Sequence, residues 1–503
     1  MKSINTVLNV VHLLIICFAN IQAQNLGTEF NLISSNNDLM GGSLVTFCSD
    51  GIEENLAIGM SDYDRNINTS IDTKYRLASI SKTITAIAIM QLVEQNLLDI
   101  DADISTILGY TVENPYFTSS PITTRMLLSH TSTIIDGSTY NSFLNDTNNT
   151  IPTPNLSEIL VSGGNYYSIS QFTNTLPGTY FNYSNINYII LGTIVEKLTN
   201  LRFDIYCKQN ISDPLGIDAS FNVNDLNNID QLAVIYRKIN NIWTAQVDNY
   251  QGVQPLFNNL DNYIPGTNGG LFNPQGGFRC SAQDLAKIFL VLMNEGTYDG
   301  VTLLSTSSCN LMLSNAWTYN GSNGNNYYGL FLSWGLGIHR ITSTPANDIA
   351  LPGSQSLYGH SGEAYGLVSN AYFDLDRNFG FIFMNNGIGT GYQINNNSVF
   401  YTVEQDVFNA IENLGNIANC SQTMSLNEMQ SPGFNIYPNP CSKLVFINHS
   451  KTTPLHVNIY NSAGVLIKAV ILESQDNQIN IEDLEQGLYF ISINNQISKL
   501  IKV

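Results

Sequence analysis

Residues 75–98, YRLASISKTITAIAIMQLVEQNLL, form the stretch that most constrains the fold. Beyond Ser79 the sequence is apolar on almost every face of a helix, and such a helix packs in the middle of a domain. Ser79 and Lys82 lie three residues apart at its start, which puts both side chains on one face of the first turn. The pattern predicts a buried helix that begins with two neighbouring polar groups.

The Ser79–Lys82 pair has two interpretations. A serine becomes a nucleophile when a base lies beside it, and a lysine can be that base when burial or a nearby charge lowers its pKa. The positive end of the helix dipole would stabilise an oxyanion at Ser79. The alternative is a core helix that is only capped by a serine. Ser79-x-x-Lys82 is the one Ser-x-x-Lys in the sequence, so the choice depends on the rest of the chain.

Length and composition bound the possible classes. The 503 residues suggest two or three domains. With 43% hydrophobic and 12% charged residues, the chain has the composition of a well-filled globular protein rather than a disordered one. The net charge of -20 argues against nucleic acid or an anionic membrane as a partner.

The N-terminus indicates export. Lys2, an apolar run over residues 7–18 and the sequence Ile21-Gln22-Ala23 are typical of a secretory signal peptide, residues 1–23. The run is too short to span a bilayer, and no later stretch reaches the length of a membrane helix. We expect a soluble protein without a transmembrane segment, secreted or at the cell surface by way of the periplasm.

The sequence gives no sign of a metal or cofactor. His130, His339 and His360 are isolated, without the spacing of metal ligands around them. An oxidising compartment would permit disulfides, but the spacing fixes no pairing, and free buried thiols are at least as consistent with it. The cysteines after the signal peptide are Cys48, Cys207, Cys280, Cys309, Cys420 and Cys441.

Residues 24–420 have predicted strands at both ends and a helical insertion between them, which is typical of an α+β domain. The first strands cover residues 42–49 and 55–59, with a turn at Asp50-Gly51. Further strands are predicted over residues 330–338, 366–373 and 380–385, and helices over residues 122–128, 186–198, 282–294 and 403–414.

Three segments have other patterns. Residues 133–182 are expected to form long surface loops because Asn, Ser, Thr and Gly dominate them, and residues 203–275 mix short helices with irregular segments. Residues 421–433 lack apolar periodicity and are predicted to be a linker. Residues 434–503 are short alternating strands separated by turn residues, which predicts a small antiparallel all-β sandwich.

RLASISKT followed by LVEQNLLDIDADI closely resembles the serine hydrolases of the penicillin-binding and class C β-lactamase type, whose signatures include Ser-x-x-Lys. LLSHTST over residues 127–133 resembles a further block of that family, Tyr183-Ser184-Asn185 its Tyr-x-Asn motif, and His360-Ser361-Gly362 its Lys-Thr-Gly in a His-x-Gly form. The resemblance covers roughly residues 30–418. It implies a β-lactamase/transpeptidase-like antiparallel sheet flanked by helices, with a helical subdomain.

The same resemblance implies three catalytic residues. Ser79 would attack an acyl carbon and become the acyl-enzyme. Lys82 would take the Ser79 proton or keep Tyr183 deprotonated. Tyr183, with its phenol pKa lowered by the Lys82 cation, would pass a proton to the leaving group and later activate water.

Substrate and oxyanion binding would fall to Asn185, His360, Ser361, Gly362 and Glu363. Asn185 would contact the substrate or hold Lys82, and the backbone N–H groups of Ser79 and Glu363 would form the oxyanion hole. His360 would replace a permanent cation with a group that titrates near neutrality, so recognition of a β-lactam carboxylate is less secure. The Glu363 carboxylate would point either into the cleft or away. His130 is expected to be structural, with its ring tying the loop after the helix.

The last seventy residues resemble the sorting domains of the type IX secretion system. FNIYPNP at residues 434–440, IYN at residues 459–461, GLYF at residues 487–490 and the closing KLIKV carry the resemblance. Physically this is a proline-guarded edge strand that leads into a sandwich, and an adhesive or carbohydrate-binding sandwich is the alternative. The resemblance implies the secretion machinery as a partner.

Together these patterns predict a secreted serine hydrolase that acts on ester or amide bonds of small molecules or D-amino-acid peptides. The alternative within enzymes is a DD-carboxypeptidase or β-lactamase. The alternative from another class is a penicillin-binding-like protein that only senses or binds ligands.

Overall fold

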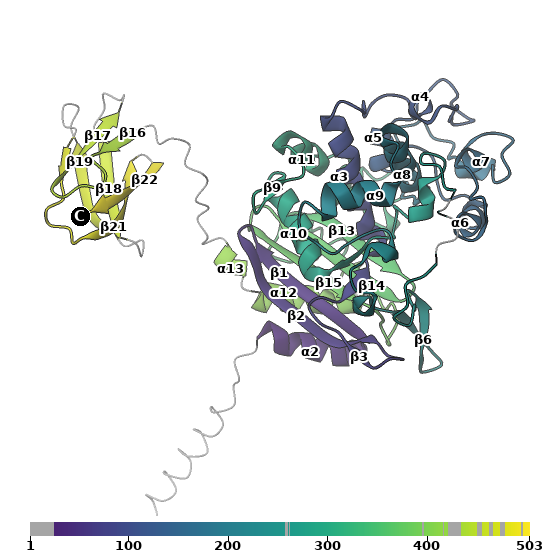
Figure 1. Cartoon of the computed structure of the whole chain (residues 1–503), viewed down its shortest axis with the longest axis horizontal. Coiled ribbons are helices and arrows are strands. Elements are labelled where there is room, and N and C mark those ends of the chain that lie inside the picture. Colours follow the sequence, from purple (N-terminus) through teal and green to yellow (C-terminus); the bar gives the residue numbers. More distant parts are fainter. Residues whose placement is uncertain are drawn as a thin grey trace, which may run out of the picture. The chain divides into compact units, whose positions relative to one another are not determined.

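The structure is a computed structural model that describes residues 25–256, 260, 262–394, 397–415, 417–420, 434–449, 455–461, 466–472, 478–493 and 496–503. The predicted signal peptide, residues 1–23, and the predicted linker, residues 421–433, lie outside the described residues. The chain divides into two compact units, Met1–Gln422 and Thr423–Val503 (Figure 1).

A nine-stranded sheet forms the centre of the first unit, in the order β10-β11-β12-β13-β14-β15-β1-β2-β3. Its neighbouring strands are antiparallel. The N-terminal strand β1 pairs with β15, so segments more than 300 residues apart in the sequence are neighbours inside the sheet. The strands are β1 (Gly41–Cys48), β2 (Gly51–Asp62), β3 (Ile67–Asn68), β10 (Trp317–Thr318), β11 (Ser333–Trp334), β12 (His339–Ile341), β13 (Leu357–Ala364), β14 (Leu367–Asp374) and β15 (Phe379–Asn385).

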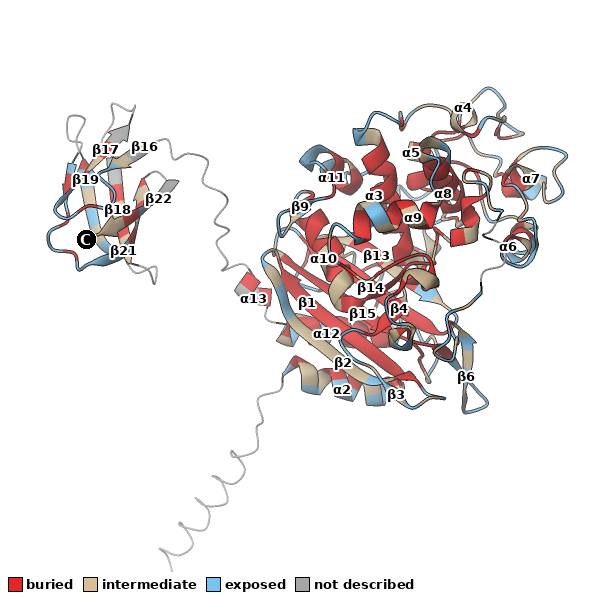
Figure 2. Cartoon of the chain, in the orientation of Figure 1, coloured by how far each residue is buried: buried red, intermediate tan, exposed pale blue. Residues whose placement is uncertain are grey.

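Helices cover both faces of this sheet. The helices α2 (Leu26–Asn37) and α12 (Thr402–Leu414) pack on one face, where they share a buried cluster with β14 and β15. The helix α10 (Ala282–Met293), which Ser281 caps, packs on the other face against β1 and β15. Figure 2 shows the buried strands of the sheet and the buried helices beside them. The α+β architecture with an antiparallel sheet is confirmed.

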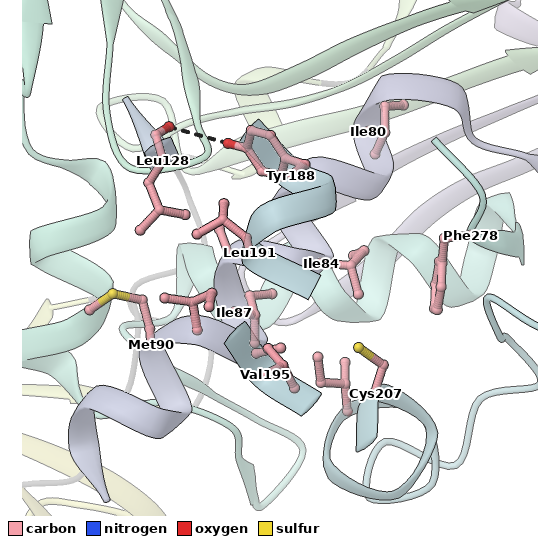
Figure 3. Packing of buried hydrophobic residues seen from close by; sticks show 14 of the residues in the cluster. Ile80, Ile84, Ile87, Met90, Leu128, Tyr188, Leu191, Val195, Cys207 and Phe278 are labelled. Atoms are coloured by element: carbon pink, nitrogen blue, oxygen red, sulfur yellow. Dashed lines mark hydrogen bonds between the residues drawn. The ribbon is translucent and has the colours of Figure 1, made fainter. Parts of the chain in front are cut away.

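The predicted central helix is α3 (Ser81–Glu94), and every residue from 81 to 92 is buried. It packs against α8 (Ile186–Thr199), which is also buried along most of its length. Figure 3 shows side chains of this contact, including Ile84 and Ile87 of α3 and Leu191 of α8. Because apolar side chains surround α3 on all sides, a polar group at its start loses contact with bulk water.

Part of the region that the sequence predicted to form loops is helical. Residues 133–182 include α6 (Tyr140–Asn149), α7 (Ser157–Leu160) and a 3-10 turn, Ile169–Gln171, so the prediction of long loops was wrong for these segments. In α6 only Tyr140, Phe143 and Thr147 are buried, and the polar residues between them hid the helical period. The remaining described helices are α4 (Ile104–Leu108), α5 (Thr124–Leu128), α9 (Phe203–Cys207), α11 (Thr306–Leu313) and α13 (Ile417–Cys420).

The strand predictions need two corrections. Residues 330–338 do not form one strand, because the chain turns between β11 and β12 at Gly335 and Gly337, and Gly337 has a φ of 72°. A Cβ at Gly337 would lie 2.3 Å from that of Ala86, so the turn presses directly against α3. The sequence also missed a hairpin of β5 (Ile235–Ile239) and β6 (Ile242–Val247). Further short pairs join β4 (Lys74–Arg76) to β7 (Arg279–Ser281), and β8 (Thr297–Tyr298) to β9 (Val301–Thr302).

The second unit consists of two antiparallel sheets around its own buried cluster. One sheet has the order β16-β17-β20 and the other β19-β18-β21-β22, which confirms the predicted all-β character. Their bounds are β16 (Phe434–Tyr437), β17 (Leu444–His449), β18 (Leu455–Asn461), β19 (Leu466–Leu472), β20 (Gln478–Asn480), β21 (Gly487–Ile493) and β22 (Gln496–Lys502).

One disulfide, Cys48–Cys420, links the end of β1 to the last described residue of the first unit. The cysteines at 207, 280, 309 and 441 are free and buried. The sequence left both disulfides and free buried thiols open, and the structure contains both. Among the described residues, no helix is both long and apolar enough to cross a membrane.

We expect the Cys48→Ser/Cys420→Ser double variant to lose about 2–5 kcal/mol in free energy of unfolding, because the disulfide closes a loop of 372 residues in the unfolded chain. Urea denaturation monitored by circular dichroism measures this. Dithiothreitol should destabilise the wild type and leave the double variant unchanged. Equal stability of the oxidised wild type and the variant would contradict the assignment.

Candidate active site

Ser79 lies in a 3-10 turn, Ala78–Ile80, that leads directly into α3. Ala78 has a φ of 48°, a left-handed conformation that is strained for a residue with a side chain. The strand β13 passes close to this turn at Gly362, where a Cβ would lie 2.4 Å from the carbonyl oxygen of Leu77 and 3.2 Å from the Cβ of Ala78. Only glycine fits there, and the close approach brings the β13 strand beside Ser79.

Lys82 is fully buried, and its ammonium group has three hydrogen-bond partners. Nζ lies 3.0 Å from Ser79 Oγ, 2.9 Å from Asn185 Oδ1 and 2.8 Å from the carbonyl oxygen of Gln275. The last two oxygens only accept. When Lys82 loses a proton, its two remaining N–H groups are therefore held by Asn185 and Gln275, and its lone pair faces the Ser79 hydroxyl.

Burial lowers the pKa of Lys82 from 10.5 to about 7, because the charged form loses its hydration. The carboxylate of Asp136 opposes this shift by stabilising the ammonium form. The lysine can thus exchange its proton near neutral pH, which a surface lysine cannot do.

Tyr183 stands over Lys82, with Nζ 4.9 Å from the centre of its ring. Its ring stacks on Phe331 at a centroid distance of 5.2 Å and lies 4.4 Å from the ring of His130. Loss of hydration raises the pKa of the phenol, and a hydrogen bond with Ser79 offsets this only in part. The prediction that the Lys82 cation lowers this pKa was wrong, because burial is the largest effect on the phenol and raises its pKa. Tyr183 is a protonated phenol at neutral pH.

Asp136 is a residue of this site that the sequence analysis missed. Its carboxylate accepts hydrogen bonds from Ser184 Oγ at 3.1 Å, from the backbone N–H of Asn185 at 3.1 Å and from that of Ile186 at 2.9 Å. It also accepts from Asn185 Nδ2 at 2.9 Å, which turns Asn185 Oδ1 toward Lys82. The sequence feature that pointed to Asp136 is its position just after the LLSHTST block, four residues beyond Ser132. No local pattern pairs it with Asn185, which lies 49 residues further along the chain.

His130 is structural, as expected. Its Nδ1 accepts from the backbone N–H of Ser184 at 3.1 Å, and its ring packs between Tyr183 and Trp334. It therefore holds the segment that carries Tyr183.

His360 lies on the other side of Tyr183, with 6.1 Å between the ring centroids. It is buried, and its Nδ1 lies 2.6 Å from the carbonyl oxygen of Ser361, so Nδ1 carries the proton. Burial and the nearby Lys82 lower the pKa of His360 well below 6.5. The expectation that it titrates near neutrality was wrong, and His360 is a neutral imidazole there.

Ser361 begins a chain of hydrogen bonds whose direction the last acceptor fixes. His339 Nε2 lies 3.0 Å from the carbonyl oxygen of Leu330 and must donate to it. Burial lowers the pKa of His339 to about 3, so its Nδ1 accepts, and Tyr372 donates to it at 2.8 Å. The Ser361 hydroxyl, 2.6 Å away, therefore donates to the Tyr372 oxygen.

Glu363 points toward the cleft rather than away from it. Its carboxylate accepts a hydrogen bond of 2.7 Å from the Tyr401 hydroxyl, and both side chains line the cleft. The pairing of β12 with β13 ends at Gly359, so residues 360–364 have β14 on one side and border the cleft on the other.

These residues surround one cleft of about 640 Å³. It is lined by Ser79, Tyr183, Asn185, His360, Ser361, Gly362 and Glu363, while Lys82 lies buried beneath Ser79. The structure thus brings together all eight residues that the sequence predicted for the site. Aromatic and aliphatic side chains form much of the remaining wall: Tyr140, Leu144, Tyr327, Phe331, Val399 and Phe400.

Comparison with known proteins identifies the family of each part of the chain. A family model described as Beta-lactamase matches residues 33–398, and one described as a secretion system C-terminal sorting domain matches residues 435–503. The second match marks the protein as one that is secreted or held at the cell surface. Protein flp of Staphylococcus aureus (strain MRSA252) is 26% identical over 186 residues, which are 37% of this chain and 35% of that protein. The chain thus spans about a third of the length of this curated relative.

Solved structures share the fold. A penicillin-binding protein homologue from Pyrococcus abyssi has a TM-score of 0.57 at 17% identity, covering 95% of this chain and 98% of that chain. A D-amino acid amidase from Ochrobactrum anthropi SV3 has a TM-score of 0.56 at 17% identity, covering 79% and 98%.

We expect Asp136→Ala to lower the free energy of unfolding by about 1–3 kcal/mol, because four donors at the start of α8 lose their acceptor. Urea denaturation measures the change. Asp213→Ala is the matched control, since Asp213 is exposed and has one ion pair, with Lys208. An effect no larger than that of the control would contradict the role given to Asp136.

Proposed function

Since the chain belongs to the beta-lactamase family of serine hydrolases, we propose that it cleaves ester or amide bonds through an acyl-enzyme on Ser79. The observation that carries this is the arrangement around Lys82. Two acceptor oxygens hold its N–H groups, and its lone pair faces a serine that lines the cleft. A buried lysine arranged in this way has the geometry and the pKa of a general base.

In the acylation step, Ser79 Oγ forms a bond to the acyl carbon, and its proton passes to Lys82 Nζ. The negative charge on the acyl oxygen is stabilised by the backbone N–H groups of Ser79 and Glu363. The bond to the leaving group then breaks, and the leaving group takes the proton of the Tyr183 hydroxyl. The proton on Lys82 restores Tyr183. The raised pKa of Tyr183 supports its role as an acid rather than a resting phenolate.

Deacylation uses the same groups, with the proton transfers in the opposite direction. A water molecule attacks the acyl carbon, one of its protons passes to the Tyr183–Lys82 pair, and Ser79 recovers a proton as the ester bond breaks. Asn185, fixed by Asp136, keeps Lys82 in place throughout. The volume and apolar wall of the cleft suit small esters, amides or D-amino-acid peptides.

The alternatives differ in which probes label Ser79. We expect a fluorophosphonate to label the purified protein and Ser79→Ala to abolish the label, because the probe reacts with activated serines. Labelling by a fluorescent penicillin as well would favour a DD-carboxypeptidase or β-lactamase. Labelling by neither probe would contradict the hydrolase and favour a protein that only binds ligands.

The pH dependence tests Lys82 as the base. We expect kcat/KM for p-nitrophenyl acetate to fall about tenfold for each pH unit below 7, because only neutral Lys82 can accept the Ser79 proton and its pKa is lowered to about 7. The variant Asp136→Asn should move this limb to lower pH, since the Asp136 carboxylate stabilises the ammonium form. A rate that is independent of pH between about 5.5 and 7.5 would contradict the assignment.

A further inference from the structure

The strand β13 determines on which side of Ser79 the acyl group and the leaving group of the substrate lie. Gly362 lies against Ala78, the residue before the nucleophile. Toward the start of β13, His360 lies beside Tyr183, the proposed proton donor to the leaving group. Toward its end, Glu363 lies beside Tyr401. The leaving group therefore occupies the His360 end of the cleft, and the acyl group occupies the Glu363 end.

The side chains along this strand offer hydrogen-bond acceptors. The Nδ1 proton of His360 goes to the carbonyl of Ser361, so Nε2 holds the lone pair, but Nε2 is buried and has no partner among the described residues. The Ser361 hydroxyl donates its hydrogen bond to the Tyr372 oxygen. The Glu363 side chain is exposed in the cleft and offers acidic oxygens there. A substrate that binds Glu363 must present a hydrogen-bond donor to it.

Nearby charges leave Glu363 available to a cation. None of the ion pairs among the described residues involves Glu363. Of the two arginines that line the cleft, Arg76 is held by two hydrogen bonds to Asp248. The guanidinium of Arg237 lies over the ring of Tyr392, 5.9 Å from its centre. Arg237 and Glu363 both act on Tyr392, and among the described lining residues Arg237 is the cation that would serve a substrate carboxylate instead.

Tyr401 gives the Glu363 carboxylate a fixed position. Its hydroxyl donates to Glu363, and its ring stacks on Tyr392 at a centroid distance of 5.0 Å. Its backbone N–H donates at 2.7 Å to the buried carboxylate of Glu404, which Asn370 also holds at 2.8 Å. One oxygen of Glu363 is thus occupied by Tyr401, and the other is left for a ligand in the cleft.

We propose that the acyl part of the substrate carries a protonated amine, which binds the Glu363 carboxylate beside Tyr401. This inference rests on the proposed acyl-enzyme on Ser79. Its substrate class is aminoacyl amides and esters, with an apolar side chain against the aromatic wall. The reaction is the proposed hydrolysis, and it releases a free amino acid and the protonated leaving group.

The test compares phenylalanine p-nitroanilide, as both enantiomers, with its N-acetyl and N-succinyl derivatives at pH 7, where an α-amine is mostly protonated. The three substrates share the leaving group and differ in the charge of the acyl part. For one enantiomer we expect kcat/KM of the free amine to exceed that of the N-acetyl derivative about tenfold or more. Glu363→Gln should remove this preference, because it should lower kcat/KM of the free amine about tenfold more than that of the N-acetyl derivative.

Controls separate charge recognition from damage to the strand. Glu53→Gln, an exposed residue outside the cleft lining, should keep the preference. Tyr401→Phe should weaken it, because the carboxylate loses the hydroxyl that positions it. An equal loss for all three substrates in Glu363→Gln would overturn the inference, since Glu363 would then only shape the strand. A preference for the N-succinyl derivative that Arg237→Gln abolishes would overturn it as well.

Failure of the hydrolase itself gives a different result. A protein that turns over none of these substrates or p-nitrophenyl acetate, and that no fluorophosphonate labels, would overturn both proposals. A protein that is labelled at Ser79 and hydrolyses p-nitrophenyl acetate, but does not prefer the free amine, would overturn only the substrate inference.

Discussion

The loss of water around Lys82 is the constraint on which the rest of the site depends. An ammonium group without bulk solvent survives only where oxygens replace its hydration, and here Ser79, Asn185 and the Gln275 carbonyl replace it. The same burial brings the pKa of Lys82 to about 7. A more solvated lysine would stay charged and could not take a proton from serine at neutral pH.

The fold supplies this environment through contacts between distant segments. The apolar helix α3 needs α8 and the turn at Gly337 around it, and the packing that stabilises the domain also removes water from Lys82. Asp136 joins the loop after α5 to the start of α8 and so sets the orientation of Asn185. The close contact of Gly362 with Ala78 brings the edge of β13 to the nucleophile. These features, α8, Gly337, Asp136 and Gly362, are all distant from Ser79 in the sequence. All of them act on the atoms around Ser79 and Lys82.

The sequence predicted what local spacing determines. Ser79 and Lys82 share a helix start, so their contact follows from three residues of separation, and the apolar run after them predicted the burial of α3. Ordered motifs located Tyr183 and His360, but not their ionisation, because the pKa of each depends on side chains such as Trp334 and Phe331 that tertiary structure brings in. For the same reason, local patterns could not identify three further features. These are the role of Asp136, the Cys48–Cys420 pair and the side of the strand that Glu363 faces.

The most direct test of the account is a titration of Lys82 itself by NMR, with lysines labelled with 13C at the ε position. We expect one lysine signal that titrates near pH 7, in agreement with the lowered pKa of Lys82, and that disappears in Lys82→Arg. If every lysine signal instead titrates near its ordinary value of about 10.4, Lys82 is charged at neutral pH and cannot be the base that activates Ser79.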